Sequence, residues 1–232
     1  MLPVLILAGG LATRLRPITE TIPKALIEIA GEPFIYHQLR YLRSQGVTRV
    51  ILSVGYLGEM IESLVGNEKK FDLEISVVYD GSTLLGTGGA VKKALPLLGE
   101  SFFIQYGDSF LPVDFSMVQT AFMTSEKPAL MTVLKNDNQW DKSNVIFENN
   151  QLLEYNKKIH KPQMNYIDYG LGVFAKEVFE RYPVDGPFDL ATVYSELSSK
   201  NMLAGFEVYE RFYEIGSRLG IEQANDYFRK LK

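Results

Sequence analysis

A short apolar run that ends in two glycines gives the clearest indication of the fold: Val4-Leu5-Ile6-Leu7-Ala8-Gly9-Gly10. Its consecutive large apolar residues, with no polar residue between them, indicate a strand that is buried on both faces, as in a parallel sheet. The two glycines that follow leave a bare backbone, which a ligand can approach closely. We therefore expect a buried parallel strand with a ligand site directly after it.

Strand, loop and helix continue to alternate through the first half of the chain. Strands are expected at residues 50–54, 73–79 and 102–106, and helices are expected to begin near residues 33, 60 and 86. This alternation predicts an α/β fold with a doubly wound, mostly parallel (Rossmann-like) sheet.

The second half of the chain is less regular. A hairpin is expected at Asn149-Asn150, and the other expected elements are strands at 129–134 and 166–174 and helices near 176–182, 189–200 and 217–232. With no internal repeat and no clear linker, residues 1–232 are expected to form a single domain.

Composition excludes several classes of protein. Of the 232 residues, 46% are hydrophobic and 22% are charged, which is ordinary for a soluble globular protein. The chain has no cysteine, so it has no disulfide, no thiolate metal site and no cysteine nucleophile. A formal net charge of −4 argues against general nucleic-acid binding. No apolar run approaches the roughly 20 residues of a membrane span, and we expect a cytoplasmic protein.

The loop after the first strand has the chemistry of a phosphate site. Residues 9–24 carry Arg14, Arg16 and Lys24 against a single acidic residue, Glu20. Backbone N–H groups at the glycines can bind phosphate, Arg14 can bind phosphate oxygens bidentately, and Lys24 adds a mobile point charge. Each of these residues alone would suit a connecting loop; together they favour a phosphate-binding loop.

The same residues carry a family resemblance. The pattern G-G-x-x-T-R-L-x-P, followed by P-K, is matched by Gly9-Gly10, Thr13-Arg14-Leu15, Pro17 and Pro23-Lys24. The chain resembles the nucleotidyltransferases that activate sugar 1-phosphates, from Leu5 to about Tyr227. Within that family it is similar to the short enzymes that act on heptose, mannose or N-acetylmuramate 1-phosphates.

The resemblance implies an activity. The protein is expected to transfer a nucleoside monophosphate from a nucleoside triphosphate to a sugar 1-phosphate, with release of pyrophosphate. Residues of about 1–110 would bind the nucleotide and about 111–232 the sugar phosphate. GTP with heptose or mannose 1-phosphate is the preferred pair. The alternatives are UTP with an N-acetylated sugar 1-phosphate, a different phosphate acceptor, or a nucleotide-sensing paralogue without catalysis. No nucleic-acid or membrane partner is implied, and a monomer or a small homo-oligomer is expected.

The resemblance also implies a nucleotide site. The segment Leu85–Ala90 matches an L-G-T-G-G-A stretch that packs against nucleotide and sugar in the family. The implied catalytic residues are Arg14, on the triphosphate, Lys24, near the α-phosphate, and Asp108. The implied nucleotide-binding residues are Leu7, Ala8, Gly9, Gly10, Thr13, Arg14, Lys24, Asp80, Gly86 and Thr87.

A metal pair and a sugar-phosphate site complete the expectations. Asp108 follows the strand at 102–106 and matches a metal-binding aspartate of the family, while Glu214 stands where many relatives have a second aspartate. Both are expected to bind Mg²⁺, a hard cation that prefers oxygen ligands. The implied sugar-phosphate site is Gly88, Gly89, Lys157, Asp168 and Gly170. Lys157 is preferred over its neighbour Lys158, although the proline of the family's E-K-P segment is absent here.

Overall fold

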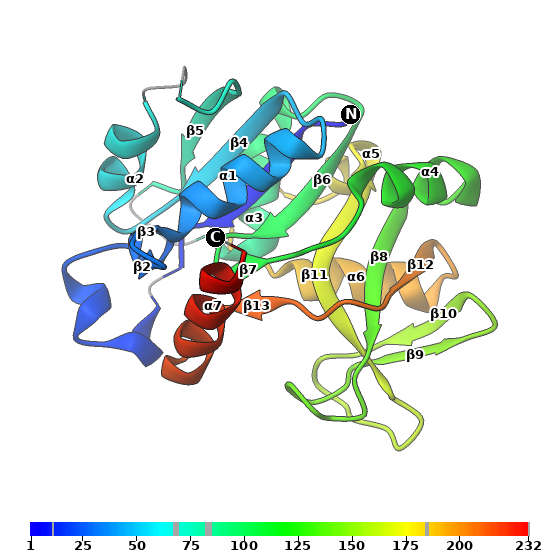
Figure 1. Cartoon of the computed structure of the whole chain (residues 1–232). Coiled ribbons are helices and arrows are strands. Elements are labelled where there is room, and N and C mark those ends of the chain that lie inside the picture. The colour runs from blue at the N-terminus through cyan, green and yellow to red at the C-terminus, as the bar shows by residue number, and fades with distance from the viewer. Residues whose placement is uncertain (11, 67–69, 82–84, 184–185, 232) are drawn as a thin grey trace.

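A central sheet of nine strands organises the molecule (Figure 1). The computed structural model describes residues 1–10, 12–66, 70–81, 85–183 and 186–231. The strands of the central sheet are β1 (Val4–Ala8), β4 (Arg49–Val54), β5 (Glu74–Tyr79), β6 (Ser101–Tyr106), β8 (Ala129–Lys135), β9 (Val145–Glu148), β10 (Gln151–Tyr155), β11 (Tyr166–Ala175) and β12 (Leu203–Val208).

One half of the sheet is parallel, as the sequence predicts. The strand order is β10-β9-β11-β6-β1-β4-β5, and β1 pairs in parallel with both β4 and β6, while β4 pairs in parallel with β5. The carboxyl ends of these strands therefore meet at one edge, where ligands bind in α/β folds. The expected doubly wound, mostly parallel sheet is confirmed.

The other half of the sheet is mixed. Strand β11 runs antiparallel to β6 and β8, and β12 pairs in parallel with β8. The expected hairpin joins β9 to β10, and Asn149 and Asn150 both have positive φ at its turn. Strand β11 carries a register shift between Asp168 and Gly172 against β8, and Gly170 inside it has φ +100°. This irregularity lies beside the carboxyl end of β6.

Helices cover both faces of the sheet (Figure 1). Helices α1 (Phe34–Ser44), α2 (Gly58–Val65) and α4 (Phe115–Ser125) share one buried apolar cluster, and α3 (Gly86–Ala94), α5 (Glu177–Glu180) and α6 (Leu190–Ser199) share another. The alternation along β1 explains the two clusters: Val4 and Ile6 belong to the first and Leu5 to the second. The sequence patterns above did not include α4.

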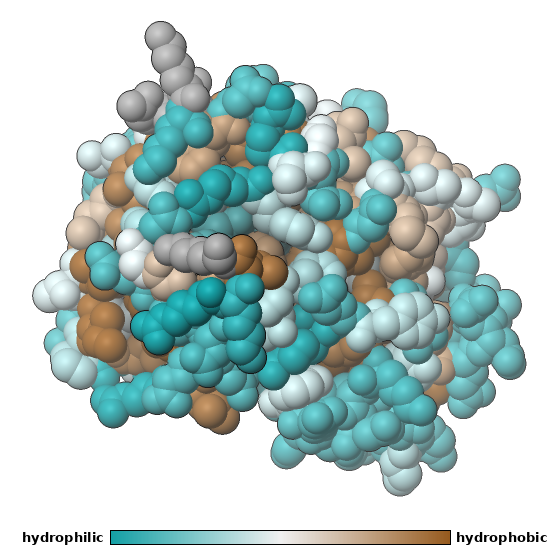
Figure 2. All heavy atoms as spheres, in the orientation of Figure 1, coloured by the Kyte–Doolittle hydropathy of each residue, from teal (hydrophilic) through white to brown (hydrophobic). Residues whose placement is uncertain are grey.

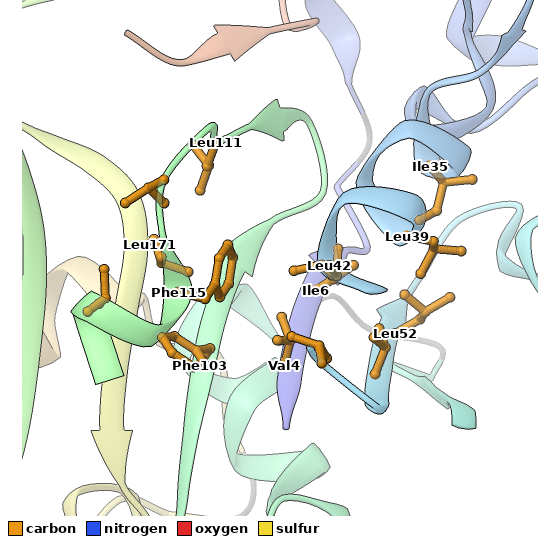
Figure 3. Close-up of a cluster of buried hydrophobic side chains, with 14 of the residues drawn as sticks. Val4, Ile6, Ile35, Leu39, Leu42, Leu52, Phe103, Leu111, Phe115 and Leu171 are labelled. Carbon is orange, nitrogen blue, oxygen red and sulfur yellow. The ribbon is translucent and has the colours of Figure 1, made fainter. Parts of the chain in front are cut away.

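Figure 3 shows how the first cluster fixes the parallel strands. Ile35, Leu39 and Leu42 of α1 point toward Ile6 and Leu52 of the sheet. Their spacing of three and four residues places them on one side of the helix. Burying each of these side chains stabilises the fold by roughly 1.5–3 kcal/mol, so α1 is held firmly on β1 and β4.

A smaller unit lies at the carboxyl edge. It contains β2 (Glu28–Ile29), β3 (Glu32–Pro33), β7 (Ser109–Phe110), β13 (Tyr213–Glu214) and α7 (Arg218–Lys230). Strand β13 pairs with β7, so the segment before α7 lies beside the residues that follow β6. Helix α7 begins after Ser217, whose hydroxyl accepts a hydrogen bond from Gly220 N, as expected for its cap. Lys232, the last residue of the expected helix, lies outside the described residues.

The surface shows no apolar belt on the face drawn in Figure 2. The part formed by the β9–β10 hairpin and its neighbouring loops is mostly hydrophilic there. Among the described residues, none of the helices has the length and apolar character that crossing a membrane requires.

Candidate active site

A cavity of about 270 Å³ opens at the carboxyl edge of the parallel strands. The residues around it come from the ends of β1, β4, β5 and β6, from the 3-10 turn Lys24–Leu26, and from the first turns of α3 and α6. They are Leu7, Ala8, Gly9, Gly10, Lys24, Ala25, Ser53, Asp80, Gly86, Thr87, Ala90, Tyr106, Gly107, Asp108 and Asp189.

Most of the expected nucleotide-binding residues meet in this cavity: Leu7, Ala8, Gly9, Gly10, Lys24, Asp80, Gly86 and Thr87. Asp108 joins them. Thr13 and Arg14 do not line the cavity and have exposed side chains. Sequence reasoning missed Ser53, Tyr106 and Asp189. No local motif marks these three residues: the sheet order brings Ser53 and Tyr106 together, and the start of α6 brings Asp189 to them.

Lys24 and Asp108 form an ion pair at one end of the cavity. Lys24 begins a short 3-10 turn, Lys24–Leu26, and its Nζ donates a hydrogen bond to Asp108 Oδ2 at 3.0 Å. Ser109 Oγ donates to Asp108 Oδ1 at 3.1 Å. The aspartate is therefore oriented on both sides, and Lys24 is held where an incoming anion would meet a positive charge.

Arg14 lies close to Lys24 although it stands outside the cavity wall. It sits in a 3-10 turn, Thr13–Leu15, and Leu15 anchors that turn by its buried side chain. A Cβ placed on Gly216 would lie 3.6 Å from Lys24 Nζ and 3.7 Å from Arg14 Nη2. Both cations therefore approach the same glycine, where the Glu214 carboxylate also lies, and they supply two positive charges that can bind phosphate.

The Glu214 carboxylate is hydrogen-bonded within its own loop. Ser217 Oγ donates to Glu214 Oε1 at 2.7 Å, and the Gly216 N–H donates to Oε2. Backbone pairing of β13 with β7 nevertheless places Glu214 opposite Ser109, the residue after Asp108.

The residues at this end of the cavity suit a divalent cation only together with substrate. Mg²⁺ in proteins is typically held by one or two carboxylates together with substrate phosphates and waters. Asp108, at the cavity wall, suits that role once a phosphate neutralises Lys24. The Glu214 carboxylate would first have to lose its hydrogen bonds from Ser217 and Gly216 before it could bind the ion. Among the described residues there is no cluster of three or more acidic or histidine side chains that could hold a metal without substrate.

At the opposite end of the cavity lies Asp80, directly after β5. Its residue surface is 8% exposed, and Ser53 Oγ donates to its Oδ1 at 3.2 Å. Burial raises the pKa of this carboxyl, and the Ser53 hydrogen bond and the charge of Lys93 oppose the rise. A Cβ on Gly9 would lie only 2.7 Å from Asp80 Oδ2, so glycine is required for this close approach.

Helices α3 and α6 meet at the cavity through Thr87 and Asp189. Thr87 Oγ1 accepts a hydrogen bond from Leu190 N at 2.8 Å, which satisfies one of the N–H groups that the first turn of α6 leaves without a partner inside the helix. The N-cap residue here is Asp189, whose side chain makes no capping hydrogen bond. Its carboxylate is thereby left available at the cavity wall.

The expected sugar-phosphate residues lie beside the cavity and do not line it. The Asp168 residue is partly exposed, but its carboxyl is enclosed, and burial raises its pKa to about 6 while the Gly170 N–H and the charge of Lys157 oppose the rise. A Cβ on Gly170 would lie 3.5 Å from the ring of Tyr106, which does line the cavity. Asp168, Lys157 and Gly170 thus form one group on the β11 side of Tyr106.

Gly88 and Gly89 are placed differently. Both are buried in α3, and both backbone N–H groups donate to Phe188 O, at 2.9 and 3.3 Å. A Cβ on Gly88 would clash with the Phe188 ring at 2.3 Å. In this structure the two glycines let the segment before α6 pack closely on α3.

Comparison with known sequences gives three findings. A sequence profile of the family described as "Nucleotidyl transferase" matches residues 3–199. Over 215 residues the chain is 28% identical to D-glycero-alpha-D-manno-heptose 1-phosphate guanylyltransferase of Campylobacter jejuni, and the match covers 91% of this chain and 93% of the relative. Over 219 residues it is 29% identical to Mannose-1-phosphate guanyltransferase beta-A of Xenopus laevis, and it spans 60% of that protein's length.

A solved structure has the same fold. The crystal structure of HddC from Yersinia pseudotuberculosis, complexed with GMP-PN, matches with a TM-score of 0.81 and 26% sequence identity. The match covers 98% of this chain and 100% of that one.

Proposed function

Because this chain belongs to the nucleotidyl transferase family, we propose that it joins a nucleoside monophosphate to a sugar 1-phosphate and releases pyrophosphate. The observation that carries the proposal is the cavity itself. It brings the glycine loop after β1, the Lys24–Asp108 pair and the start of α3 to one edge of the sheet. A loop that merely connected two elements would not need this arrangement of cation, carboxylate and bare backbone.

The chemistry follows from the charges. An oxygen of the sugar phosphate attacks the α-phosphorus in line, its new P–O bond forms as the bond to the leaving pyrophosphate breaks, and no proton has to be removed. The nucleophile is already an anion, so the protein's task is to position two like-charged reactants and neutralise their charge.

Each side of the site would have its own role. Arg14 would bind the triphosphate and the leaving pyrophosphate, and Lys24 would move from Asp108 to the α-phosphate. Lys157 would bind the sugar phosphate, with Asp168 and Asp189 accepting hydrogen bonds from sugar hydroxyls. Of the two neighbouring lysines, Lys157 is supported by the effect of its charge on Asp168.

Mg²⁺ would be held by Asp108 together with substrate phosphates, and Glu214 would join it after exchanging its donors. Bound there, the ion would supply neutralisation of the charge that develops on the phosphate oxygens. The Lys24–Asp108 pair also favours catalysis over a purely sensing role, because sensing needs no cation at the reacting phosphate.

We further propose GTP with a heptose or mannose 1-phosphate as the substrates. The names of the two relatives and the guanine nucleotide in the HddC structure support this pair. UTP with an N-acetylated sugar 1-phosphate is the alternative.

A thermal-shift panel tests the proposal before any assay of turnover. A ligand that binds only the native state stabilises it and so raises the melting temperature. At a ligand concentration of 100 times the Kd the stabilisation is about 2.7 kcal/mol. With Mg²⁺ present, GTP and a sugar 1-phosphate should each raise it. A panel of nucleoside triphosphates and sugar phosphates that leaves it unchanged would contradict the proposal.

A further inference from the structure

A buried glutamine lies on the side of α1 that packs against the sheet. Gln38 follows Ile35 by three residues and precedes Leu42 by four, so all three belong to the same side of the helix. The Gln38 residue is 1% exposed, and among the described residues its Oε1 has no hydrogen-bond partner. Burying an acceptor in this way is costly, and an apolar side chain would fill the same space without that cost. Packing alone therefore does not account for a glutamine at this position.

The amide nitrogen of Gln38 is hydrogen-bonded to the turn that joins β6 to β7. Nε2 donates to Tyr106 O at 3.2 Å and to Ser109 O at 2.8 Å. Because both neighbours are carbonyl oxygens, the orientation of the amide is fixed: a flipped amide would turn Oε1 toward two other acceptors. The two carbonyl groups stand before and after Asp108 in the chain. One side chain of α1 therefore holds both ends of the turn, residues 106–109, that carries the cavity aspartate.

Two further contacts hold the same turn. Gln105 is 3% exposed, and its Nε2 also donates to Ser109 O, at 3.3 Å. From the other side, Ile215 N donates to Asp108 O at 2.9 Å. The main chain of the turn is thus held from α1, β6 and the segment after β13, while the Asp108 carboxylate points at Lys24 Nζ, 3.0 Å away.

We propose that Gln38 is a positioning residue of the transfer reaction, holding the turn of residues 106–109 so that Asp108 faces Lys24 at the cavity wall. The inference rests on the proposed function, because it gives Asp108 a part in the reaction. Asp108 lines the cavity and Gln38 does not, so Gln38 acts through the turn and touches no substrate. A displacement of about 1 Å at reacting groups can cost roughly 100-fold in rate, so a loosened turn is enough to lower turnover.

Gln38→Met tests this contact, since methionine is an unbranched side chain of similar length that donates no hydrogen bond. Hydrogen exchange of the whole protein, followed by mass spectrometry, should be about tenfold faster in the peptide that contains residues 107–110, the factor that corresponds to one lost hydrogen bond. In the turnover assay kcat should fall about 10- to 100-fold. The KM for GTP should stay within about threefold, because the substitution leaves the glycine loop after β1 unchanged.

Gln119→Met is the matched control. Gln119 is a half-buried glutamine of α4, and its Oε1 accepts a hydrogen bond from Leu2 N at 2.8 Å, near the N-terminus. The control removes a hydrogen bond by the same substitution, so it measures the general effect on stability. It should change neither kcat nor the exchange of residues 107–110.

Unchanged exchange of the turn in Gln38→Met would overturn the inference, and so would an unchanged kcat. A KM for GTP that rises as much as kcat falls would overturn it as well, because Gln38 would then support the nucleotide site as a whole. If Gln38→Met does not fold, the unmodified protein still decides: residues 107–110 should exchange as slowly as β6, and exchange as rapid as in an exposed loop would overturn the inference. Absence of any transfer reaction in the unmodified protein would instead contradict the proposed function, and this inference with it.

Discussion

Replacing Asp168 by asparagine should stabilise the folded protein above neutral pH and at the same time weaken the binding of sugar phosphate. The carboxyl is enclosed beside Tyr106, and burial raises its pKa from 3.8 to about 6. Asparagine keeps an acceptor for the Gly170 N–H, which now donates to Asp168 Oδ1 at 2.9 Å. The substitution therefore removes the charge and preserves the local hydrogen bond.

The sign of the effect follows from linkage. Below pH 3.8 the carboxyl is protonated in both states and contributes nothing. Between pH 3.8 and about 6 the unfolded chain loses its proton while the native state keeps it, so rising pH destabilises the fold. Above pH 6 the full cost is present, and two pKa units correspond to about 3 kcal/mol. Asp168→Asn should therefore regain most of this lost stability at pH 8 and little of it at pH 4.

The assay is thermal or urea unfolding of both proteins at pH 4 and pH 8. For a chain of this length about 3 kcal/mol corresponds to a rise in melting temperature of about 6–12 °C at pH 8. Asp226→Asn, on the exposed side of α7, controls for loss of one negative charge and should shift neither value. A stability difference of the same size at both pH values would contradict this prediction, because it could not come from ionisation of Asp168.

Three further predictions concern the remaining charged residues. Arg14→Ala should lower turnover by orders of magnitude, and its melting temperature should not change because the Arg14 side chain is exposed. Arg14→Lys should restore only part of the turnover. Near-normal turnover in Arg14→Ala would show that Arg14 does not belong to the site. Lys157→Ala should raise the KM for sugar phosphate far more than the KM for nucleotide, whereas Lys158→Ala should change neither; the reverse pattern would show that Lys158 holds the phosphate. In Mg²⁺ titrations of turnover, Asp108→Asn should abolish the Mg²⁺-dependent activity and Glu214→Gln should reduce it less. Equal titration curves for Glu214→Gln and the unmodified enzyme would exclude Glu214 as a metal ligand.

The parallel half of the fold could be predicted because its signals are local. Buried strands such as Val4–Ala8 are continuous apolar runs, and glycines follow them where the chain turns. Helix α4 was missed although Phe115, Val118 and Phe122 are buried at helical spacing. Exposed Met117 and Met123 on the same helix blur that pattern, and the signal that could have found it is Asp114, which caps the helix through the Ser116 and Met117 N–H groups.

In the candidate site, only residues that belong to sequence motifs could be predicted. Lys24 and Asp108 are 84 residues apart, and matching each to a family motif sufficed to bring them together. Asp189 could not be found this way, because it reaches the cavity only where the start of α6 packs on α3, and the Thr87–Leu190 hydrogen bond that joins them spans 103 residues. The direction of the Glu214 side chain likewise depends on Ser217 and Gly216, and no pattern in the sequence specifies a rotamer.

Release of pyrophosphate measures the proposed transfer reaction itself. The purified chain would be mixed with Mg²⁺, each nucleoside triphosphate in turn, and mannose or heptose 1-phosphate, with Arg14→Ala as the inactive reference. We expect pyrophosphate and an NDP-sugar in equal amounts, most rapidly with GTP, and only when both substrates are present. Pyrophosphate release that does not depend on any sugar phosphate, or no release with any pair of substrates, would contradict it.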